Sequence, residues 1–345
     1  MPRDIYSFPY LFRVVEAMPK PSTYILDQFF SEGTVFETEE IEIQTKKGHK
    51  PLAPYVNELM PGKVILRTGF TARQYKPALV KPMRVITSID LKVRRAGESL
   101  FNPDNPDVRA QKLLTEDLID LNDSVVQRMG EMASSLMFTG KVTQVGEGVS
   151  QELDYDFENI YTLSGTDLFS DPNADVQGIL GDIKRDVMQK SGRTPRKILT
   201  TFEVGRTIMN HPTVKEIAKI NNNAVISAGN LNQEMLPDGV TYHGYLQQVD
   251  LHVYSLIASY TNDNGVETDF IPAGTLAMLP DGKPFEFSYG ANLIMGDNGA
   301  FQYVKARITP QSWTSKEPAA RYLQLLSRPF PIPVDVNGWA VAKVM

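Results

Sequence analysis

The apolar residues between positions 107 and 139 recur every three or four residues, which predicts one long amphipathic helix. The stripe consists of Leu114, Leu118, Leu121, Val125, Met129, Met132 and Leu136. No proline interrupts this stretch, and Gly140 stands where a helix commonly ends in a left-handed cap. Roughly 30 residues at a rise of about 1.5 Å give a rod on the order of 45–50 Å. We therefore predict a spine helix, and Gly130 within the stripe argues against a long coiled coil.

The first 32 residues are broken by four prolines, and we interpret them as an N-terminal arm. Within the arm, residues 21–30 predict a short helix with Ser22 or Thr23 as its N-cap. The aromatic side chains of Tyr24, Phe29 and Phe30 need cover. They either pack on their own domain, which composition favours, or dock on a neighbouring subunit.

Residues 33–95 have the pattern of extended chain, with apolar and polar residues alternating around Ile41 and Ile43. Prolines punctuate the stretch from residue 51 to residue 82, so we expect edge strands or a projecting hairpin. The stretch 63–95 is basic, with Asp90 as its one acid. Its basic residues are Lys63, Arg67, Arg73, Lys76, Lys81, Arg84, Lys92, Arg94 and Arg95. Contact with nucleic acid is one explanation, and charge complementarity with an acidic neighbour is the other.

Beyond residue 172 the pattern is mixed α/β. We predict a helix at 175–192 that ends at Gly192, a buried strand at 197–202 and a helical stretch at 203–220 broken at Pro212. A loop at 221–234 precedes short strands at 240–245, 249–255, 275–280, 285–290 and 301–308. Residues 261–272 predict a hairpin tip with a two-residue turn at Asn264-Gly265. The end of the chain is extended, and we expect it to return to an earlier domain.

Composition narrows the classes of function. The net charge of −6 and pI of about 5.4 disfavour tight DNA binding by the chain as a whole. The absence of cysteine excludes disulfides, thiol nucleophiles and iron–sulfur clusters. The N-terminus lacks the continuous apolar run of a signal peptide, and no stretch of about 18 apolar residues predicts a membrane span.

Motifs of catalysis are missing from the sequence. The four histidines form no metal-binding spacing, and we interpret them as surface or packing residues. None of the Gly-Lys pairs has the surroundings of a phosphate-binding loop, and no nucleophile elbow occurs. We therefore expect no cofactor, no metal and no enzymatic activity, with an enzyme built from unrelated positions as the remaining alternative.

The order of segments resembles the HK97-type capsid fold, and short motifs are similar to the lambda-type major capsid proteins of tailed bacteriophages. The resemblance covers nearly the whole chain and rests on the number and order of the motifs. They are LDQFFSEGTVFETEEIEI (26–43), LAPYV (52–56), PG (61–62), YKPALVKP (75–82), ENIYTLSGTDLFSDPNADVQGIL (158–180), VETDFIPAGTLAMLP (266–280) and ARYLQLLSRPFPIPVDVNGWAVAKV (320–344). The expected helix carries fewer basic residues at its start than the family pattern, which puts individual charge pairs in doubt.

The resemblance implies an α+β fold of five segments. These are an N-terminal arm (1–32), an extended β-hairpin loop (33–95), a peripheral domain with the spine helix (96–172), an α/β axial domain (173–310) and a return strand to the peripheral domain (311–345). It also implies a major capsid protein that self-assembles through pentamers and hexamers into an icosahedral or prolate shell around phage double-stranded DNA. An encapsulin-like compartment shell is the alternative.

The same resemblance implies partners and a location. A decoration protein, a portal and a scaffold are the implied protein partners, and packaged DNA meets the inner face non-specifically. The chain would be part of the virion and would assemble in the host bacterial cytoplasm. We hypothesise that basic residues of the extended loop pair with acids on the spine helix of a neighbour. The candidate intersubunit contacts are Arg67, Arg73, Lys76, Lys81, Arg84, Glu116, Asp117 and Asp120, together with Tyr24, Phe29 and Phe30.

Overall fold

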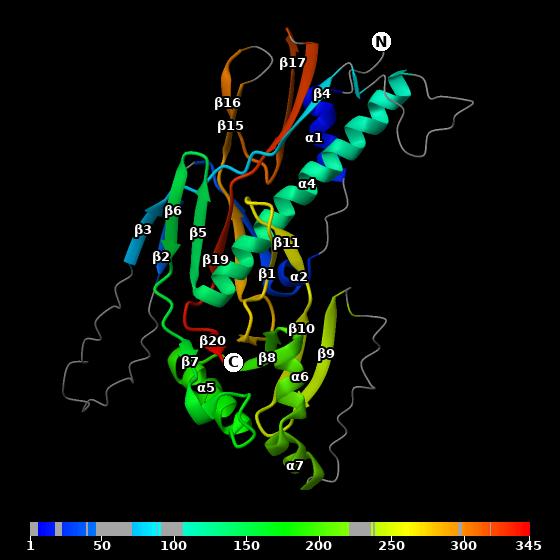
Figure 1. Cartoon of the computed structure of the whole chain (residues 1–345). Helices are drawn as coiled ribbons and strands as arrows, with labels where there is room; N and C mark the ends of the chain where they lie inside the picture. Colours follow the sequence, from blue (N-terminus) through cyan, green and yellow to red (C-terminus); the bar gives the residue numbers. More distant parts are fainter. Residues whose placement is uncertain are drawn as a thin grey trace, which may run out of the picture.

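The computed structural model describes residues 6–17, 23–38, 41–45, 71–87, 89–90, 106–220, 236, 239–295, 299–317 and 319–345. Its longest element is helix α4 (Pro106–Thr139), which runs from one end of the molecule to its middle (Figure 1). All seven residues of the predicted stripe are buried, and Gly140 has a φ of 69°. The predicted spine helix and its glycine cap are therefore confirmed.

Close packing explains why a glycine occupies position 130 within the helix. A Cβ atom there would lie 2.9 Å from Cε1 of the Phe270 ring. Phe270 ends the short hairpin of β11 (Ser259–Thr261) and β12 (Glu267–Asp269), and Ser134 donates a hydrogen bond to its carbonyl. The hairpin thus lies directly against α4, and glycine permits this close approach.

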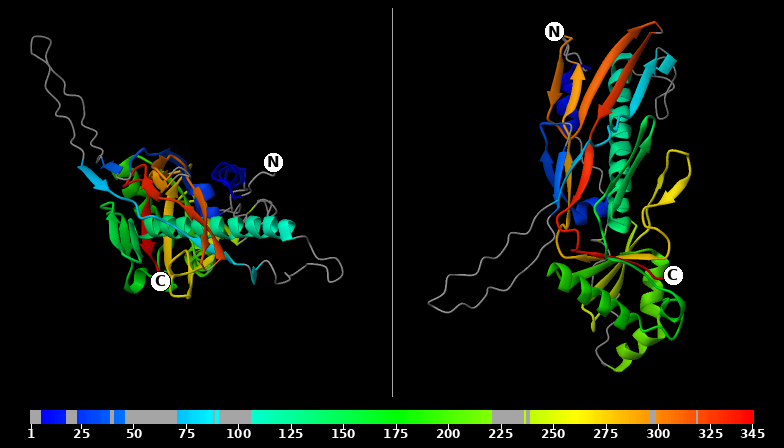
Figure 2. Two further views of the ribbon diagram at one scale, coloured as in Figure 1. Left: turned by 90° about the horizontal axis from the view of Figure 1, so that it is seen from above. Right: turned by 90° about the vertical axis from the view of Figure 1, so that its left-hand side faces the viewer.

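A six-stranded sheet forms the other end of the molecule, in the order β7-β20-β13-β8-β10-β9. Its strands are β7 (Ile160–Thr162), β8 (Pro195–Thr200), β9 (Val240–Leu246), β10 (Leu251–Leu256), β13 (Thr275–Pro280) and β20 (Ala340–Lys343). Helices α5 (Val176–Ser191), α6 (Phe202–Asn210) and α7 (Pro212–Ile220) lie beside it (Figures 1 and 2). One face of the sheet packs with these helices through residues such as Ile198, Val253 and Met278.

The local signals in this part predicted its helices well. Asp175 caps α5 by accepting a hydrogen bond from the Gly178 N–H at 2.9 Å, and Gly192 ends the helix with a φ of 73°. The break at Pro212 separates α6 from α7 as expected. Strand β8 begins and ends two residues before the predicted strand, and α6 begins at Phe202.

The opposite face of the six-stranded sheet joins the core around α4. Ala277, Leu279 and Val341 belong to the same buried cluster as the apolar stripe of that helix. Trp339 lies fully buried between the two parts: its ring stacks on Phe157 at 4.3 Å. Its Nε1–H donates a hydrogen bond to the carbonyl of Met137 at 3.1 Å. The core around α4 therefore extends to this face of the sheet, while a second buried cluster lies between the other face and helices α5–α7.

The N-terminal segment is more ordered than the prolines predicted. It forms helix α1 (Phe8–Ala17), with Pro9 in the first turn, where a missing N–H costs nothing. Helix α2 (Tyr24–Phe29) has Thr23 as its N-cap residue, but the Thr23 side chain makes no capping hydrogen bond. Strand β1 (Phe30–Val35) then pairs in parallel with β14 (Phe285–Tyr289), whose other neighbour is β19 (Pro329–Pro333).

Shorter sheets and hairpins surround α4. A three-stranded sheet has the order β17-β18-β4, with β4 as an edge strand, as the neighbouring prolines predicted. The remaining strands around α4 form two-stranded sheets, which pair β2 with β3, β5 with β6, β11 with β12 and β15 with β16. The bounds are β4 (Met83–Thr87), β17 (Thr309–Lys316), β18 (Ala319–Leu326), β2 (Ile41–Thr45), β3 (Thr71–Tyr75), β5 (Lys141–Gly146), β6 (Val149–Asp154), β15 (Asn292–Met295) and β16 (Phe301–Val304).

The hairpin predicted at 261–272 exists, but its turn differs from the prediction. Asn262 and Val266 are hydrogen-bonded, and the Gly265 N–H donates to the Asn262 carbonyl at 2.9 Å. The turn therefore has Asp263 and Asn264 at its centre, and Gly265 comes next with a φ of 75°. This is the three-residue loop in which glycine takes the left-handed position, rather than the two-residue turn.

The closing segment divides among three sheets. Strand β18 pairs with β4, β19 pairs with β14, and β20 enters the six-stranded sheet between β7 and β13.

Several predictions concern residues outside the described ranges. These are the prolines at 51, 54 and 61 and the loop at 221–234.

Candidate assembly surfaces

A pairing between the basic segment and the acidic helix exists within one chain. Arg84 on β4 forms an ion pair with Asp120 on α4, with 3.1 Å between Nη2 and Oδ2. Both side chains are more than half exposed. We predicted that Arg84 and Asp120 contact a neighbouring subunit, and the structure joins them to each other because β4 crosses beside α4.

The other charged candidates are distributed differently. Lys76, Lys81 and Glu116 are exposed, whereas Asp117 is 9% exposed. Asp117, one of the candidate intersubunit contacts, therefore has little exposed surface to offer a neighbouring subunit. Its neighbours on the helix, Leu113, Leu114, Leu118 and Leu121, are all buried, so the covered face is wider than the predicted stripe. Arg67 lies outside the described residues, and Arg73 is placed only by its backbone on β3.

The three aromatic candidates are buried in their own chain. Tyr24, Phe29 and Phe30 are at most 9% exposed, and Phe30 stacks on Phe285 with 5.0 Å between ring centroids. Packing on their own domain, the first of the two alternatives, therefore accounts for them. Their contact with a neighbour stays a prediction with little exposed surface to support it.

An open cleft of about 720 Å³ lies between α4, the β5–β6 hairpin, the segment 78–82 and the tip of the β11–β12 hairpin. Gln144 lies on its floor and accepts three hydrogen bonds at its Oε1. The donors are the Tyr75 hydroxyl at 2.7 Å, the Ala78 N–H at 3.0 Å and the Gln151 Nε2 at 2.9 Å. This one side chain therefore ties the end of β3 to the β5–β6 hairpin, and burial raises the pKa of Tyr75 to about 12.

Charged side chains line the mouth of this cleft. Arg128 on α4 pairs with Asp263 at the hairpin tip and, at 3.5 Å, with Glu131 one turn along the helix. Burial raises the pKa of the Glu131 carboxyl, and the charge of Arg128 opposes that rise. Sequence reasoning missed this group, because no local pattern relates Asp263 to residues of α4.

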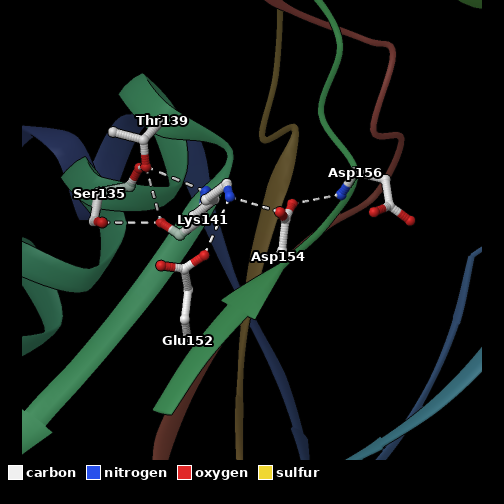
Figure 3. A network of polar contacts seen from close by, with 6 residues as sticks. All are labelled: Ser135, Thr139, Lys141, Glu152, Asp154 and Asp156. Atoms are coloured by element: carbon white, nitrogen blue, oxygen red, sulfur yellow. Dashed lines mark hydrogen bonds and ion pairs between the residues drawn. The ribbon is translucent and has the colours of Figure 1, made fainter. Parts of the chain in front are cut away.

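A polar network joins the C-terminal end of α4 to the β5–β6 hairpin (Figure 3). The Lys141 ammonium contacts Asp154 at 2.7 Å and Glu152 at 3.1 Å. The hydroxyls of Ser135 and Thr139 donate to the Lys141 carbonyl. Hydrogen bonds to Asp154 and Glu152 raise the pKa of Lys141, which keeps the ammonium charged. The network lies at the junction where the hairpin leaves the helix.

Two features of the described residues bear on other functions. No group of three or more His, Asp or Glu side chains within this part of the chain could hold a metal ion. Of the helices placed there, none is both long and apolar enough to cross a membrane.

Comparison with known proteins identifies the family. Residues 7–344 match the family described as phage major capsid protein E. The chain belongs to this family. Its fold is accordingly the HK97-type capsid fold of α+β class, as the resemblance implied. Phage major capsid proteins are structural proteins of the phage head.

Individual relatives agree with this family assignment. The major capsid protein of Escherichia phage lambda is 24% identical over 347 residues, which cover 99% of each chain. That of Enterobacteria phage P21 is 24% identical over 336 residues, or 92% of this chain and 93% of the relative. The crystal structure of a prophage capsid protein from Escherichia coli CFT073 superposes with a TM-score of 0.69 at 20% identity, covering 98% and 99%.

Proposed function

We propose that this protein is the major head protein of a tailed phage and self-assembles into an icosahedral or prolate shell around double-stranded DNA. The observation that carries the proposal is the match of residues 7–344, because it spans both ends of the fold and the α4 core between them. No catalytic step is part of this function. The chain works through its surfaces, as a subunit of the virion assembled in the host bacterial cytoplasm.

Several finer features belong to the same proposal. The six-stranded sheet with α5–α7 forms the centre of pentamers and hexamers, and the part around α4 joins neighbouring subunits. The net charge of −6 supports modest, non-specific contact with packaged DNA, because a strongly basic inner face would be needed for tight binding. A decoration protein, a portal and a scaffold are the further partners we expect.

Sizing of the purified chain tests the proposal. We expect megadalton particles in size-exclusion chromatography and regular shells in negative-stain images. A small, uniform oligomer under all assembly conditions would contradict it. The molecules enclosed in the particles then distinguish a phage head from an encapsulin-like compartment. We expect particles from infected cells to contain DNA. An enzyme enclosed in the particles would instead favour the compartment.

A further inference from the structure

The β15–β16 hairpin presents an apolar face that nothing in the described part of the chain covers. In its register Leu293 is opposite Tyr303 and Met295 is opposite Phe301. Side chains alternate between the faces of a strand, so these four lie on one face. They are 39%, 59%, 52% and 69% exposed, respectively. We refer to this set as the hairpin face.

The opposite face of the hairpin packs against the rest of the molecule. Ile294 is 3% exposed and lines a cleft of about 620 Å³ together with Phe8 of α1 and Trp313 of β17. Met295 also contributes to the lining of this cleft, although 52% of its surface stays exposed. The hairpin is thus held to the molecule by one side while the hairpin face points outward. In Figure 2 it projects at the end of the molecule opposite α5–α7.

Four large apolar side chains on a two-stranded ladder are unusual at an exposed position. Large aromatic residues contribute about 150–250 Å² each when fully exposed, so the hairpin face offers on the order of 400 Å² of surface. Isolated two-stranded hairpins are marginally stable in water. An apolar partner would stabilise the ladder and remove this surface from water.

The size and charge of the surface indicate its partner. It offers about half of the roughly 800 Å² per partner that a specific interface buries, so it suits one contact among several in an assembly better than a free dimer. No charged residue occurs in β15 or β16. Two such faces therefore meet without like-charge repulsion. The basic residues just beyond β16 are neutralised, since Lys305 pairs with Glu37 and Arg307 pairs with Glu32.

We propose that the hairpin face is an interface between copies of this chain, in which it packs on the same face of a second copy. This inference rests on the proposed shell function, because the surface is too small to hold two subunits together alone. Apolar packing between identical patches related by rotation is the usual geometry of symmetric assemblies.

Cysteine cross-linking tests the proposal directly, because the natural chain has no cysteine. In a Tyr303→Cys variant any disulfide must join two copies through the hairpin face. We expect oxidised particles of this variant to give dimers in non-reducing gels. The matched control is Gln302→Cys, which is also exposed and one residue away but lies on the opposite face of the strand. We expect it to remain monomeric.

A second variant tests the energetic role. Met295→Thr combined with Phe301→Ser should raise the subunit concentration needed for assembly about tenfold or more, while the thermal unfolding midpoint of free subunits stays unchanged. The Gln302→Cys variant should assemble as the natural chain does.

Each other result has a defined meaning. A thiol at 303 that is protected in particles but never cross-links contradicts packing of like faces and points to a different surface or a decoration protein. Equal maleimide reactivity at 303 in particles and free subunits would overturn the interface altogether, while leaving the shell function intact. Failure of the unchanged chain to form particles contradicts the shell function and the interface with it.

Discussion

At the residue scale, Gly130 and Gly181 provide a comparison of two helical glycines. Gly130 faces the Phe270 ring, whereas a Cβ at Gly181 on α5 would meet only Val249 at an ordinary 3.4 Å. Alanine in place of a helical glycine gains about 1 kcal/mol in propensity. Overpacking costs about 1–3 kcal/mol, so at position 130 it offsets or exceeds that gain.

We therefore expect Gly181→Ala to stabilise free subunits by about 1 kcal/mol. The free energy of unfolding of the Gly130→Ala variant should be about 1–3 kcal/mol lower than that of the Gly181→Ala variant. Urea denaturation of both variants at one pH measures the difference. Equal stabilisation by the two substitutions would show that the Phe270 ring moves aside without cost.

Glu131 predicts a pH dependence. Burial raises its pKa above the ordinary value of 4.5, so the folded chain binds this proton more tightly than the unfolded chain. The contribution of Glu131 to the free energy of unfolding therefore falls as the pH rises from about 4.5 through the raised pKa. Ionised Glu131 reduces stability at neutral pH, in spite of its contact with Arg128.

Glu131→Gln removes this titration. We expect the stability of the variant relative to the natural chain to increase as the pH rises above about 4.5, as measured by denaturant midpoints of free subunits. Glu116→Gln, which replaces an exposed carboxylate on the same helix, is the matched control for the loss of one negative charge. Identical slopes for the Glu131→Gln variant and the natural chain would contradict the assignment.

At the scale of elements, the junction between α4 and its neighbours depends on one buried link and one exposed network. The last carbonyls of a helix have no partner within it, and Trp339 supplies one for Met137. The Lys141 network in Figure 3 has more ion pairs, but the side chains of Lys141, Glu152 and Asp154 are 37–51% exposed. Water screens such pairs, so burial outweighs the number of contacts.

The two links can be compared by single substitutions. Trp339→Phe keeps an aromatic ring but leaves a buried carbonyl without its donor, and we expect a loss of about 1–3 kcal/mol. Lys141→Ala should cost clearly less, because its ion pairs are open to solvent. Thermal or urea unfolding of free subunits measures both. A larger loss for Lys141→Ala would mean that the exposed network, and not the core, sets the hairpin angle.

At the scale of the whole molecule, the basic segment and the acidic helix predict a charge-dependent assembly. Lys76 and Lys81 are exposed near the cleft beside α4, and Asp120 is already engaged by Arg84 in the same chain. Glu116 is another exposed acid on the same helix, and we test it as the acidic partner for a neighbouring subunit. Single exposed pairs contribute only about 0–1 kcal/mol, but a shell repeats each of them many times.

Reversal of Lys76 and Lys81 to Glu should impair particle formation, and Glu116→Lys in the same chain should restore part of it. Light scattering during assembly gives the yield and rate. Lys283→Glu with Lys316→Glu changes the net charge equally at other exposed positions and serves as the control. Normal particles from the Lys76/Lys81 reversal would rule out these lysines as intersubunit contacts.

Local patterns in the sequence determined the helices other than α1. The stripe and Gly140 predicted α4, while Asp175, Gly192 and Pro212 marked the ends of α5, α6 and α7. These signals are reliable because helical hydrogen bonds and caps involve residues only a few positions apart. The composition and missing motifs likewise directed attention from a pocket to surfaces, and the ordered motifs indicated the capsid family.

Only the tertiary structure decided how distant segments meet. Pairing of Phe30 with Phe285, the division of the closing segment among three sheets and the Arg84–Asp120 contact join residues with no local relation. Burial of Asp117 resulted from its neighbours in the folded chain. The hairpin face depends on sequence and tertiary structure together. The apolar residues at 293, 295, 301 and 303 alternate with other residues in the sequence. Strand register and the packing of Ile294 determine which side of the hairpin remains exposed.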